Sequence, residues 1–313
     1  MGESASASVP ARIGLLGNPS DGYFGACISV PLVEMTATVS LLPCPSGDLV
    51  WPDEPGLRRI LLPTLAEYQT WSGRASTSFR CVVQTDIPRQ VGLAGSSAIE
   101  TALFEALLSW NGHASDAIDA DSLAAAVMRV EAEHLGMVAG LQDRLPQAHR
   151  TMLHMDFERR RMETTGHALS TPLDVSLLPP LWLAHGPPGQ DSGEVHGGLP
   201  ARWAAAESEM LMIIDSLREC ADLGLVAILE ADDAGLGRLI DRNFDLRRRL
   251  FGDDALGETL DMVLLARDLG SCAKQTGSGG AIFGPVPAEQ PDFIDTVRHR
   301  FAESGWTIRE AVV

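Results

Sequence analysis

Strand-like and helical segments follow one another along this chain without strict alternation, and this order constrains its fold more than any other feature. The expected strands are rich in β-branched residues or alternate between apolar and polar positions: residues 12–16, 26–33, 36–42, 78–84, 281–286 and 307–312. The expected helices carry apolar residues at helical spacing: residues 97–110, 123–135, 202–223, 227–251, 258–269 and 292–304. Mixed strands and helices of this kind predict an α+β protein.

A proline-rich segment divides the chain. Residues 172–188 contain five prolines, with one apolar run at 177–184 inside them. Prolines at such density are typical of a connection between domains. The chain has 313 residues, which is longer than one average domain. We therefore expect two domains, residues 1–175 and 176–313.

The charge and cysteine content argue against several classes of protein. Lys and Arg total 24 against 42 Asp and Glu, a formal net charge of −18, whereas nucleic-acid-binding proteins usually show a basic face. No apolar stretch approaches the roughly 20 residues that span a bilayer, and the first residues lack the pattern of a signal peptide. We expect a cytoplasmic protein with no nucleic-acid or membrane partner. The five cysteines have no C-x-x-C spacing and are expected to be free thiols: Cys27, Cys44, Cys81, Cys220 and Cys272.

A turn rich in glycine and serine runs directly into an expected helix. Residues 88–98 read Pro-Arg-Gln-Val-Gly-Leu-Ala-Gly-Ser-Ser-Ala. Glycines let a backbone approach a bulky anion, and the N–H groups and dipole at a helix N-terminus attract negative charge. The turn has no Lys, so it is not a Walker A loop. It is either a phosphate-binding loop or an ordinary glycine turn in which the serine pair caps the helix.

Four segments, in order along the chain, resemble the motifs of the GHMP kinase superfamily, which includes galactokinase, homoserine kinase, mevalonate kinase and phosphomevalonate kinase. Residues 10–21 are similar to the P-G-R-V-N-L-I-G-E-H-T-D segment of the sugar kinases. Residues 92–98 are similar to the G-L-G-S-S-A phosphate loop, and residues 276–281 to the C-terminal T-G-A-G-G-G loop. Residues 139–143 are similar to the C-G-I-M-D stretch that carries the catalytic Asp in galactokinases.

The resemblance implies an N-terminal domain like domain 2 of ribosomal protein S5 and a ferredoxin-like C-terminal domain. It also implies ATP and Mg²⁺ as cofactors, and transfer of the γ-phosphoryl group to a hydroxyl of a small molecule. Within the superfamily the glucuronokinase family is the most similar, on residues 14–21, 87–90, 138–144 and 171–174. The implied reaction is phosphorylation of D-glucuronate at its anomeric hydroxyl, which gives glucuronate 1-phosphate and ADP.

Two departures from the common sugar-kinase pattern bear on this expectation. Asn18 stands where galactokinases have Glu, and Pro19 stands where they have His. The phosphate loop reads Gly-Leu-Ala-Gly-Ser-Ser, one residue longer than Gly-Leu-Gly-Ser-Ser. The first departure argues against galactose as the substrate. The second keeps the phosphate role of the loop but leaves its individual N–H contacts open.

The resemblance also assigns the residues of phosphoryl transfer. Asp143 matches the catalytic carboxylate that takes or orients the proton of the sugar hydroxyl, and Arg12 matches the Arg that neutralises charge beside the transferred group. Both residue types also occur as ordinary surface charges. Ser97 matches the hydroxyl ligand of Mg²⁺, and Glu131 or Glu133 supplies the carboxylate ligand, with Glu131 preferred. The expected ATP-binding residues form the loop: Gly92, Leu93, Ala94, Gly95, Ser96, Ser97 and Ala98.

Six residues are expected to bind the substrate: Asn18, Asp21, Tyr23, Arg144, Gly277 and Ser278. A Glu at position 18 would repel the C6 carboxylate of glucuronate by roughly 4 kcal/mol at about 4 Å in a partly dry site. A neutral Asn removes that repulsion and can donate a hydrogen bond. Arg144 is the expected counter-charge for the carboxylate, and its alternative role is a surface Arg that balances an acidic chain.

Two other functions compete with a glucuronate kinase. One is another GHMP kinase, similar to galactokinase or acting on a different sugar or small alcohol. The other is a non-catalytic sugar sensor built on the same fold. The presence of Arg12, Ser97 and Asp143 argues against a sensor, because a sensor can lose these residues freely.

Overall fold

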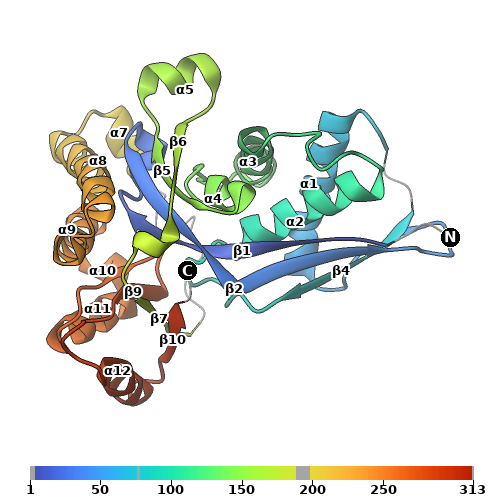
Figure 1. Ribbon diagram of the computed structural model, residues 1–313. Coiled ribbons are helices and arrows are strands. Elements are labelled where there is room, and N and C mark those ends of the chain that lie inside the picture. The colour runs from blue at the N-terminus through green and yellow to red at the C-terminus, as the bar shows by residue number, and fades with distance from the viewer. Residues whose placement is uncertain (1–3, 76–77, 188–197, 312–313) are drawn as a thin grey trace. The chain divides into compact units, whose positions relative to one another are not determined.

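The computed structural model describes residues 4–75, 78–187 and 198–311 (Figure 1). Contacts divide the chain into two compact units that interleave along the sequence. The first unit comprises Met1–Ala11, Val33–Ile87 and Ala94–Arg150, and the second comprises Arg12–Leu32, Pro88–Leu93 and Thr151–Val313. These units are defined by contacts, so the expected domain boundary after residue 175 stays a prediction.

The first unit is built on the C-terminal part of the long strand β2 (Ala26–Leu42). It pairs antiparallel with β4 (Phe79–Thr85), with Ala37 opposite Thr85, and β4 pairs in parallel with the short β3 (Leu49–Val50). The helices of this unit are α1 (Pro55–Ser72), α2 (Gly95–Trp110), α3 (Ala120–Arg129) and α4 (Arg144–His149).

Aromatic side chains fill the core of the first unit. Tyr68 of α1 and Phe104 of α2 are fully buried, with ring centroids 5.3 Å apart in an edge-to-face arrangement. That geometry is the preferred one for aromatic pairs. It fixes α2 against α1.

The second unit contains two groups of strands. The N-terminal part of β2 pairs antiparallel with β5 (Met152–Asp156), which pairs with β6 (Leu169–Leu173). Strand β1 (Ala5–Leu16) also pairs with β2, and its residues up to Ala11 belong to the first unit. A separate antiparallel sheet has the order β10-β7-β9-β8. Its strands are Thr307–Ala311, Leu181–His185, Ala281–Pro285 and Lys274–Gln275.

Helices complete the second unit. The long helices α8 (Ser208–Leu229) and α9 (Asp233–Phe251) pack against each other (Figure 1). Trp182 of β7, Phe244 of α9, and Phe293 and Phe301 of α12 (Phe293–Ala302) share one buried core. The remaining helices are α5 (Arg159–Thr165), α7 (Leu199–Ala204), α10 (Asp253–Leu256) and α11 (Glu258–Asp268).

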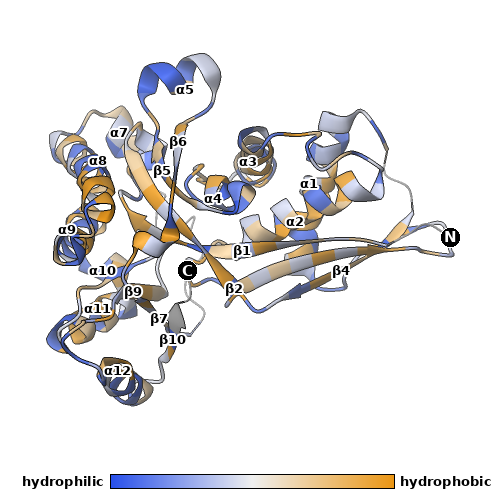
Figure 2. Ribbon diagram, viewed as in Figure 1, coloured by the Kyte–Doolittle hydropathy of each residue, from blue (hydrophilic) through white to orange (hydrophobic). Residues whose placement is uncertain are grey.

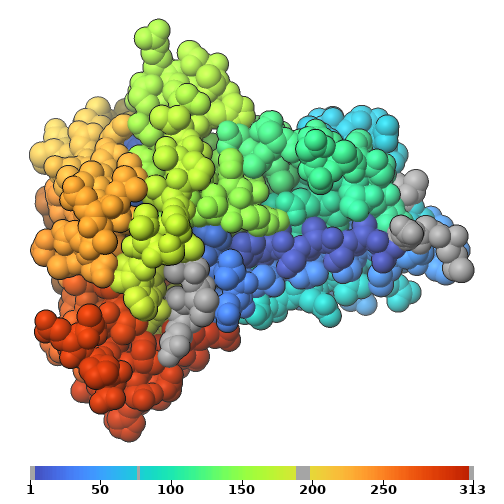
Figure 3. Space-filling model, viewed as in Figure 1, coloured from blue at the N-terminus to red at the C-terminus, as the bar shows by residue number. Residues whose placement is uncertain are grey.

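Helix α5 is hydrophilic and exposed. None of its residues is buried, Figure 2 colours it largely as hydrophilic, and Figure 3 shows its side chains projecting from the surface. It lies between β5 and β6 in the chain, so it extends that pair of strands into solvent.

The α+β class expected from the sequence is confirmed, and the strands and helices differ from it in detail. The strands expected at 26–33 and 36–42 are one strand, β2. The predicted start of the helix at 227–251 is wrong, because α8 continues to Leu229 and α9 starts only at Asp233. Asp232 caps α9 by accepting a hydrogen bond from Gly235 N at 2.8 Å. The helix expected at 202–223 is divided between α7 and α8. Helix α1, with Pro63 inside it, was not expected.

Candidate active site

One hydroxyl in the second unit connects three of the sequence motifs. Thr276 Oγ1 accepts hydrogen bonds from Arg12 Nη1 at 3.1 Å and from Gly14 N at 3.0 Å. The same hydroxyl donates to Gly92 O at 3.4 Å. Arg12 Nη1 donates to Gly92 O as well, at 2.8 Å. The N-terminal segment, the start of the glycine-serine turn and the C-terminal glycine loop therefore meet at Thr276.

Two glycines make this meeting sterically allowed. Gly92 has φ +79°, and a Cβ there would lie 2.5 Å from Thr276 O. Gly277 has φ +48°, and a Cβ there would lie 2.4 Å from Gly92 O. Both positions combine a left-handed backbone with a close backbone approach, and glycine alone tolerates the two together.

The N-terminus of α2 lies in the first unit, and the alternative in which the serine pair caps this helix is wrong. The serine pair does not cap the helix; the cap is Ala94, which has φ 59° and makes no side-chain cap hydrogen bond. A helix end without a capping side chain leaves its first N–H groups to other acceptors. Such a terminus, with the positive end of the helix dipole, suits a phosphate group.

A buried amide orients Ser97 in the first turn of α2. Gln147 is fully buried, and its Nε2 donates to Pro10 O and Ala94 O, both at 3.0 Å. Because carbonyls only accept, these contacts fix the amide with its oxygen toward Ser97, whose Oγ donates to Gln147 Oε1 at 2.7 Å. Ser97 Oγ also lies 3.2 Å from Ala94 O. The hydroxyl proton is thus held by these acceptors, and the oxygen lone pairs are left to bind a cation or a donor.

Two carboxylates and one guanidinium gather near this turn in the first unit. Glu100, three residues after Ser97 on α2, is fully buried. Glu131 lies on a single π-helical turn, Val130–His134, that continues α3, and Arg144 forms an ion pair with it and donates to Gly140 O. Burial raises the pKa of Glu100 well above its usual range; the charge of Glu131 adds to this rise and that of Arg144 opposes it.

These oxygens fit the donor set that Mg²⁺ prefers, which is one or two carboxylates together with substrate phosphates. Ser97 offers an oriented hydroxyl, and Glu131 is buried whereas Glu133 is exposed. Among the described residues, no three His, Cys, Asp or Glu side chains form a group that could hold a metal without a nucleotide. The alternative in which Glu131 is a solvated surface charge is wrong.

Asp143 immediately precedes α4, with its side chain 21% exposed and Oδ2 3.7 Å from Arg144 Nη1. Arg144 itself is buried against Glu131, so the alternative of a surface Arg is wrong for it. Arg12 is also buried, so the alternative in which it is a surface charge is wrong as well. The roles of Asp143, Arg12 and Arg144 toward a substrate stay predictions.

Two buried cations in the second unit were missed from the sequence. Lys274 Nζ donates to Asn18 Oδ1 and to Gly14 O, both at 2.7 Å. Arg247 of α9 donates through Nη2 to Gly277 O at 2.7 Å and through Nη1 to Asn18 O at 3.3 Å. Lys274 stands two residues before Thr276, which was an available signal. Arg247 lies in a run of three arginines, and nothing local distinguishes it from Arg248 and Arg249.

The other predicted substrate residues are divided between the units. Asn18 and Gly277 share Arg247 as a partner in the second unit, whereas Arg144 belongs to the first. Asp21 and Tyr23 lie on the short 3-10 helix η1 (Ser20–Tyr23) of the second unit. Tyr23 packs on Trp203 with ring centroids 5.2 Å apart, and burial, followed by the charge of Asp21, raises its pKa to about 12. Ser278, in the C-terminal glycine loop, is partly exposed.

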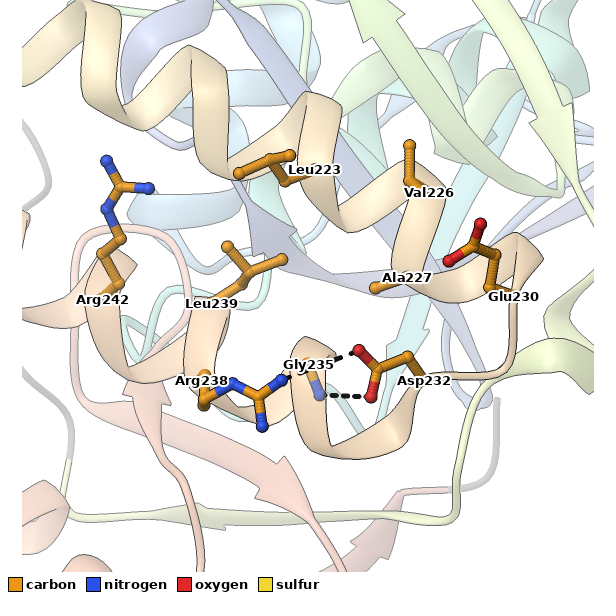
Figure 4. Close-up of a pocket in the computed structure, with 9 residues that line it drawn as sticks. All are labelled: Leu223, Val226, Ala227, Glu230, Asp232, Gly235, Arg238, Leu239 and Arg242. Atoms are coloured by element: carbon orange, nitrogen blue, oxygen red, sulfur yellow. Dashed lines mark hydrogen bonds and ion pairs between the residues drawn. The ribbon is translucent and has the colours of Figure 1, made fainter.

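A hollow of about 320 Å³ lies between α8 and α9 and contains none of the predicted site residues. Figure 4 shows Leu223 of α8 and Leu239 of α9 on its two sides, with Arg238 and Arg242 beside them. It is wide open, so it lacks the enclosure of a small-molecule site.

Comparison with known proteins shows the family. The family model described as "GHMP kinases N terminal domain" matches residues 59–150. "Glucuronokinase 1" of Arabidopsis thaliana is 35% identical over an alignment of 328 residues that covers 96% of this chain and 89% of that protein. The chain belongs to the GHMP kinase family. "Probable glucuronokinase 2" of the same plant is also 35% identical, with coverage of 95% and 88%.

Solved structures show the GHMP kinase fold. Galactokinase of Lactococcus lactis, solved with galactose, superposes with a TM-score of 0.77 at 14% identity and coverage of 99% of this chain and 94% of that chain. Mevalonate kinase of Methanococcus jannaschii gives 0.75 at 15% identity, covering 100% and 99%. The two-domain GHMP fold expected from the sequence is confirmed, and this GHMP kinase is a phosphotransferase. No helix in its described residues is both long and apolar enough to cross a membrane.

Proposed function

We propose that this GHMP kinase is an ATP-dependent sugar kinase that phosphorylates D-glucuronate at its anomeric hydroxyl. The products are glucuronate 1-phosphate and ADP. The observation that carries the proposal is the identity of 35% to "Glucuronokinase 1" over 96% of this chain. The solved structures do not help to choose the sugar, because at 12–16% identity they support the fold alone.

Phosphoryl transfer needs few protein groups, because positioning and charge neutralisation supply most of the catalysis. The anomeric oxygen of the sugar forms a bond to the γ-phosphorus, the bond from that phosphorus to the β–γ bridging oxygen breaks, and ADP leaves. Asp143 takes or orients the proton of the attacking hydroxyl. Arg12, held by Gly92 O and Thr276 Oγ1, neutralises charge on the transferred group.

The nucleotide phosphates are assigned to the loop Gly92–Ala98 and to the N-terminus of α2. The absence of a side-chain cap on Ala94 supports this assignment. Ser97 and Glu131 would hold Mg²⁺, which when bound neutralises phosphate charge. The orientation of the Ser97 hydroxyl by Gln147 supports its part in this pair.

The proposed location is the cytoplasm, with small molecules as the partners. All five cysteines are free thiols, which supports a reducing compartment. The acidic composition, with a net charge of −18, supports a protein that does not bind nucleic acid.

Replacement of the proposed catalytic carboxylate tests the reaction. With glucuronate and MgATP, Asp143→Asn should lower kcat by about 10²-fold or more, with little change in the affinity for ATP. Asp268→Asn, which changes an exposed Asp on α11, is the matched control and should leave kcat unchanged. The product is identified by ³¹P NMR as an anomeric phosphate. An Asp143→Asn enzyme with near-normal kcat, or a product phosphorylated elsewhere, contradicts the proposal.

A further inference from the structure

Two cations are buried in the second unit without a carboxylate ion pair among the described residues. Arg247 is 1% exposed and Lys274 is fully buried. Their hydrogen-bond acceptors are the backbone oxygens of Gly14, Asn18 and Gly277 and the side-chain oxygen of Asn18. Burial of a charge is costly unless an opposite charge accompanies it. An arrangement of this kind is suited to an anion that arrives with a ligand.

Three buried N–H donors around Asn18 also lack an acceptor in the described part of the chain: Nδ2 of Asn18, Nδ2 of Asn243 and Nε of Arg247. Both amide orientations are fixed by chemistry. Lys274 Nζ donates to Asn18 Oδ1, and Gly17 N donates to Asn243 Oδ1 at 2.7 Å, so each amide nitrogen must point away from these donors. Buried donors without a partner are rare in folded proteins and require an explanation.

These residues lie close together. Asn243 and Arg247 are four residues apart on α9 and therefore share one face of that helix. That face meets the turn of residues 14–18, because Asn243 binds Gly17 and Arg247 binds Asn18. Lys274 binds the same turn through Gly14 and Asn18. We refer to Asn18, Asn243, Arg247 and Lys274 as the Asn18 cluster.

We infer that the Asn18 cluster binds the carboxylate of a sugar-acid substrate, with Arg247 as its principal counter-charge and Asn18 Nδ2 as a second donor. This inference rests on the proposed sugar-kinase function and names the residues that select the acid. A guanidinium and a carboxylate are both planar, and they pair through two parallel hydrogen bonds. The carboxylate would supply both the missing negative charge and the missing acceptors.

The surroundings of Arg247 disfavour its positive charge unless an anion accompanies it. Burial, and after it the charge of the neighbouring Arg12, lowers the pKa of Arg247, which comes to about 9. Cys27 and Asp21 raise the pKa of Arg247, and the effect of Asp21 is smaller than those of burial, Arg12 and Cys27. The Cys27 thiol is itself fully buried with a pKa well above its usual value, so it carries no charge near neutral pH. An anion is therefore favoured next to Arg247.

An amide at position 18, in place of a carboxylate, leaves the positive charges of Lys274 and Arg247 without neutralisation by this side chain. The Oδ1 atom of Asn18 faces Lys274 and its backbone oxygen faces Arg247. A carboxylate at this position would neutralise both cations from within the protein. The neutral amide satisfies Lys274 and leaves the charge of Arg247 to a ligand. Arg144, the counter-charge expected from the sequence, is already paired with Glu131 in the first unit. Substitutions of Arg144 and of Arg247 can therefore be compared for their effect on the preference for the acid.

The test compares kcat/KM for glucuronate with kcat/KM for galactose and glucose at the same MgATP concentration. Arg247→Met should reduce the value for glucuronate by about 10- to 100-fold and change the values for the neutral sugars little, because a charge-assisted contact is lost. Arg247→Lys keeps the charge and should retain more of the preference than Arg247→Met. Arg249→Met removes an exposed Arg of the same helix, 3.1 Å from Glu209, and should leave the preference unchanged.

Asn18→Asp gives a second and nearly isosteric test. The new carboxylate lies against Lys274 and Arg247, so the preference for glucuronate should fall about tenfold or more while the protein remains folded. If Arg247→Met does not fold, Asn18→Asp and Arg247→Lys decide the question by the same ratio of kcat/KM values.

Each outcome has a distinct meaning. If the wild-type enzyme ignores glucuronate, the proposed function fails and the inference fails with it. If the wild-type enzyme uses glucuronate but Arg247→Met lowers kcat/KM equally for all sugars, the inference alone is overturned. If Arg144→Met removes the preference and Arg247→Met does not, the carboxylate belongs to Arg144. Selective loss in Arg247→Met and Asn18→Asp supports the Asn18 cluster.

Discussion

Among single residues, Gln147 makes three buried hydrogen bonds through one side-chain amide. Its buried amide satisfies the carbonyls of Pro10 and Ala94 and the hydroxyl of Ser97 at once. Leucine has a similar size but offers neither a donor nor an acceptor, so Gln147→Leu would leave these groups without their partner. A buried polar group left unsatisfied costs about 1–3 kcal/mol.

We therefore predict that Gln147→Leu lowers the free energy of unfolding by about 1–3 kcal/mol, measured by urea denaturation. Gln84→Leu, at an exposed position of β4, is the control and should change it by less than about 0.5 kcal/mol. A loss in Gln147→Leu no larger than in the control would show that the hydrogen bonds of Gln147 are not needed for stability.

The thiols differ in their expected reactivity. The pKa of Cys44 is lowered, mainly by its contact with Ser46, whose Oγ lies 3.2 Å from Sγ. A lower pKa means more thiolate at a given pH, and the thiolate is the reactive form. The other thiols have pKa values raised by burial: Cys27, Cys81, Cys220 and Cys272.

Native protein treated with iodoacetamide near pH 8 should therefore be alkylated first at Cys44, and Cys44→Ser should remove the fast phase. Peptide mass spectrometry after a short reaction identifies the site. Equal labelling of Cys27, Cys81 and Cys220 at the same time point would contradict the burial that the structure gives these three thiols.

The sequence identified candidate site residues that lie within motifs, but not those whose burial depends on packing against distant parts of the chain. Asn18 and Gly277 were recognised in motifs, and the structure brings both to Arg247. Arg247 and Glu100 could not be found this way, because each looks like an ordinary charge on an amphipathic helix. Their burial depends on which helix face packs inward, and that is set by residues distant in the chain.

At the scale of secondary structure, local patterns located most strands and helices but not all their ends. The helix expected at 123–135 ends as an α-helix at Arg129 and continues as a π turn, in which Leu135 N donates to Val130 O at 3.1 Å. Such turns carry no sequence pattern of their own and often occur at functional sites. Helix α1 was missed because its interior Pro63 argues against a helix.

The contact between the two glycine loops of the second unit makes a prediction at this scale. Gly92→Ala places a Cβ 2.5 Å from Thr276 O in a backbone with φ +79°. Gly112→Ala meets a similar φ of +71°, but nothing lies within 4 Å of its Cβ. Both variants carry the cost of a left-handed alanine, so the difference between them isolates the contact between the loops.

We expect Gly92→Ala to be about 1–3 kcal/mol less stable than Gly112→Ala, because overpacking against backbone atoms cannot be relieved by a side-chain movement. Thermal or urea unfolding of the two variants gives this difference. Equal stability would show that the loops are free to separate without cost.

For the whole molecule, the fold and the substrate depend on different amounts of the sequence. Proteins only 14–15% identical to this chain share its fold over nearly its full length, so the fold is compatible with very different sequences. The substrate depends on a few side chains placed on that fold. A net charge of −18 gives no general attraction for an acidic sugar, so selection of an acid requires a local group of cations such as Arg247 and Lys274.

The most direct test of the central claim is to measure ATP consumption by the purified protein with a panel of neutral sugars and sugar acids. A glucuronate kinase predicts the highest kcat/KM for glucuronate, by about tenfold or more over galactose and glucose, because a charge-assisted contact favours the acid. An enzyme that consumes ATP fastest with a neutral sugar, or that does not consume it with glucuronate, would contradict the account.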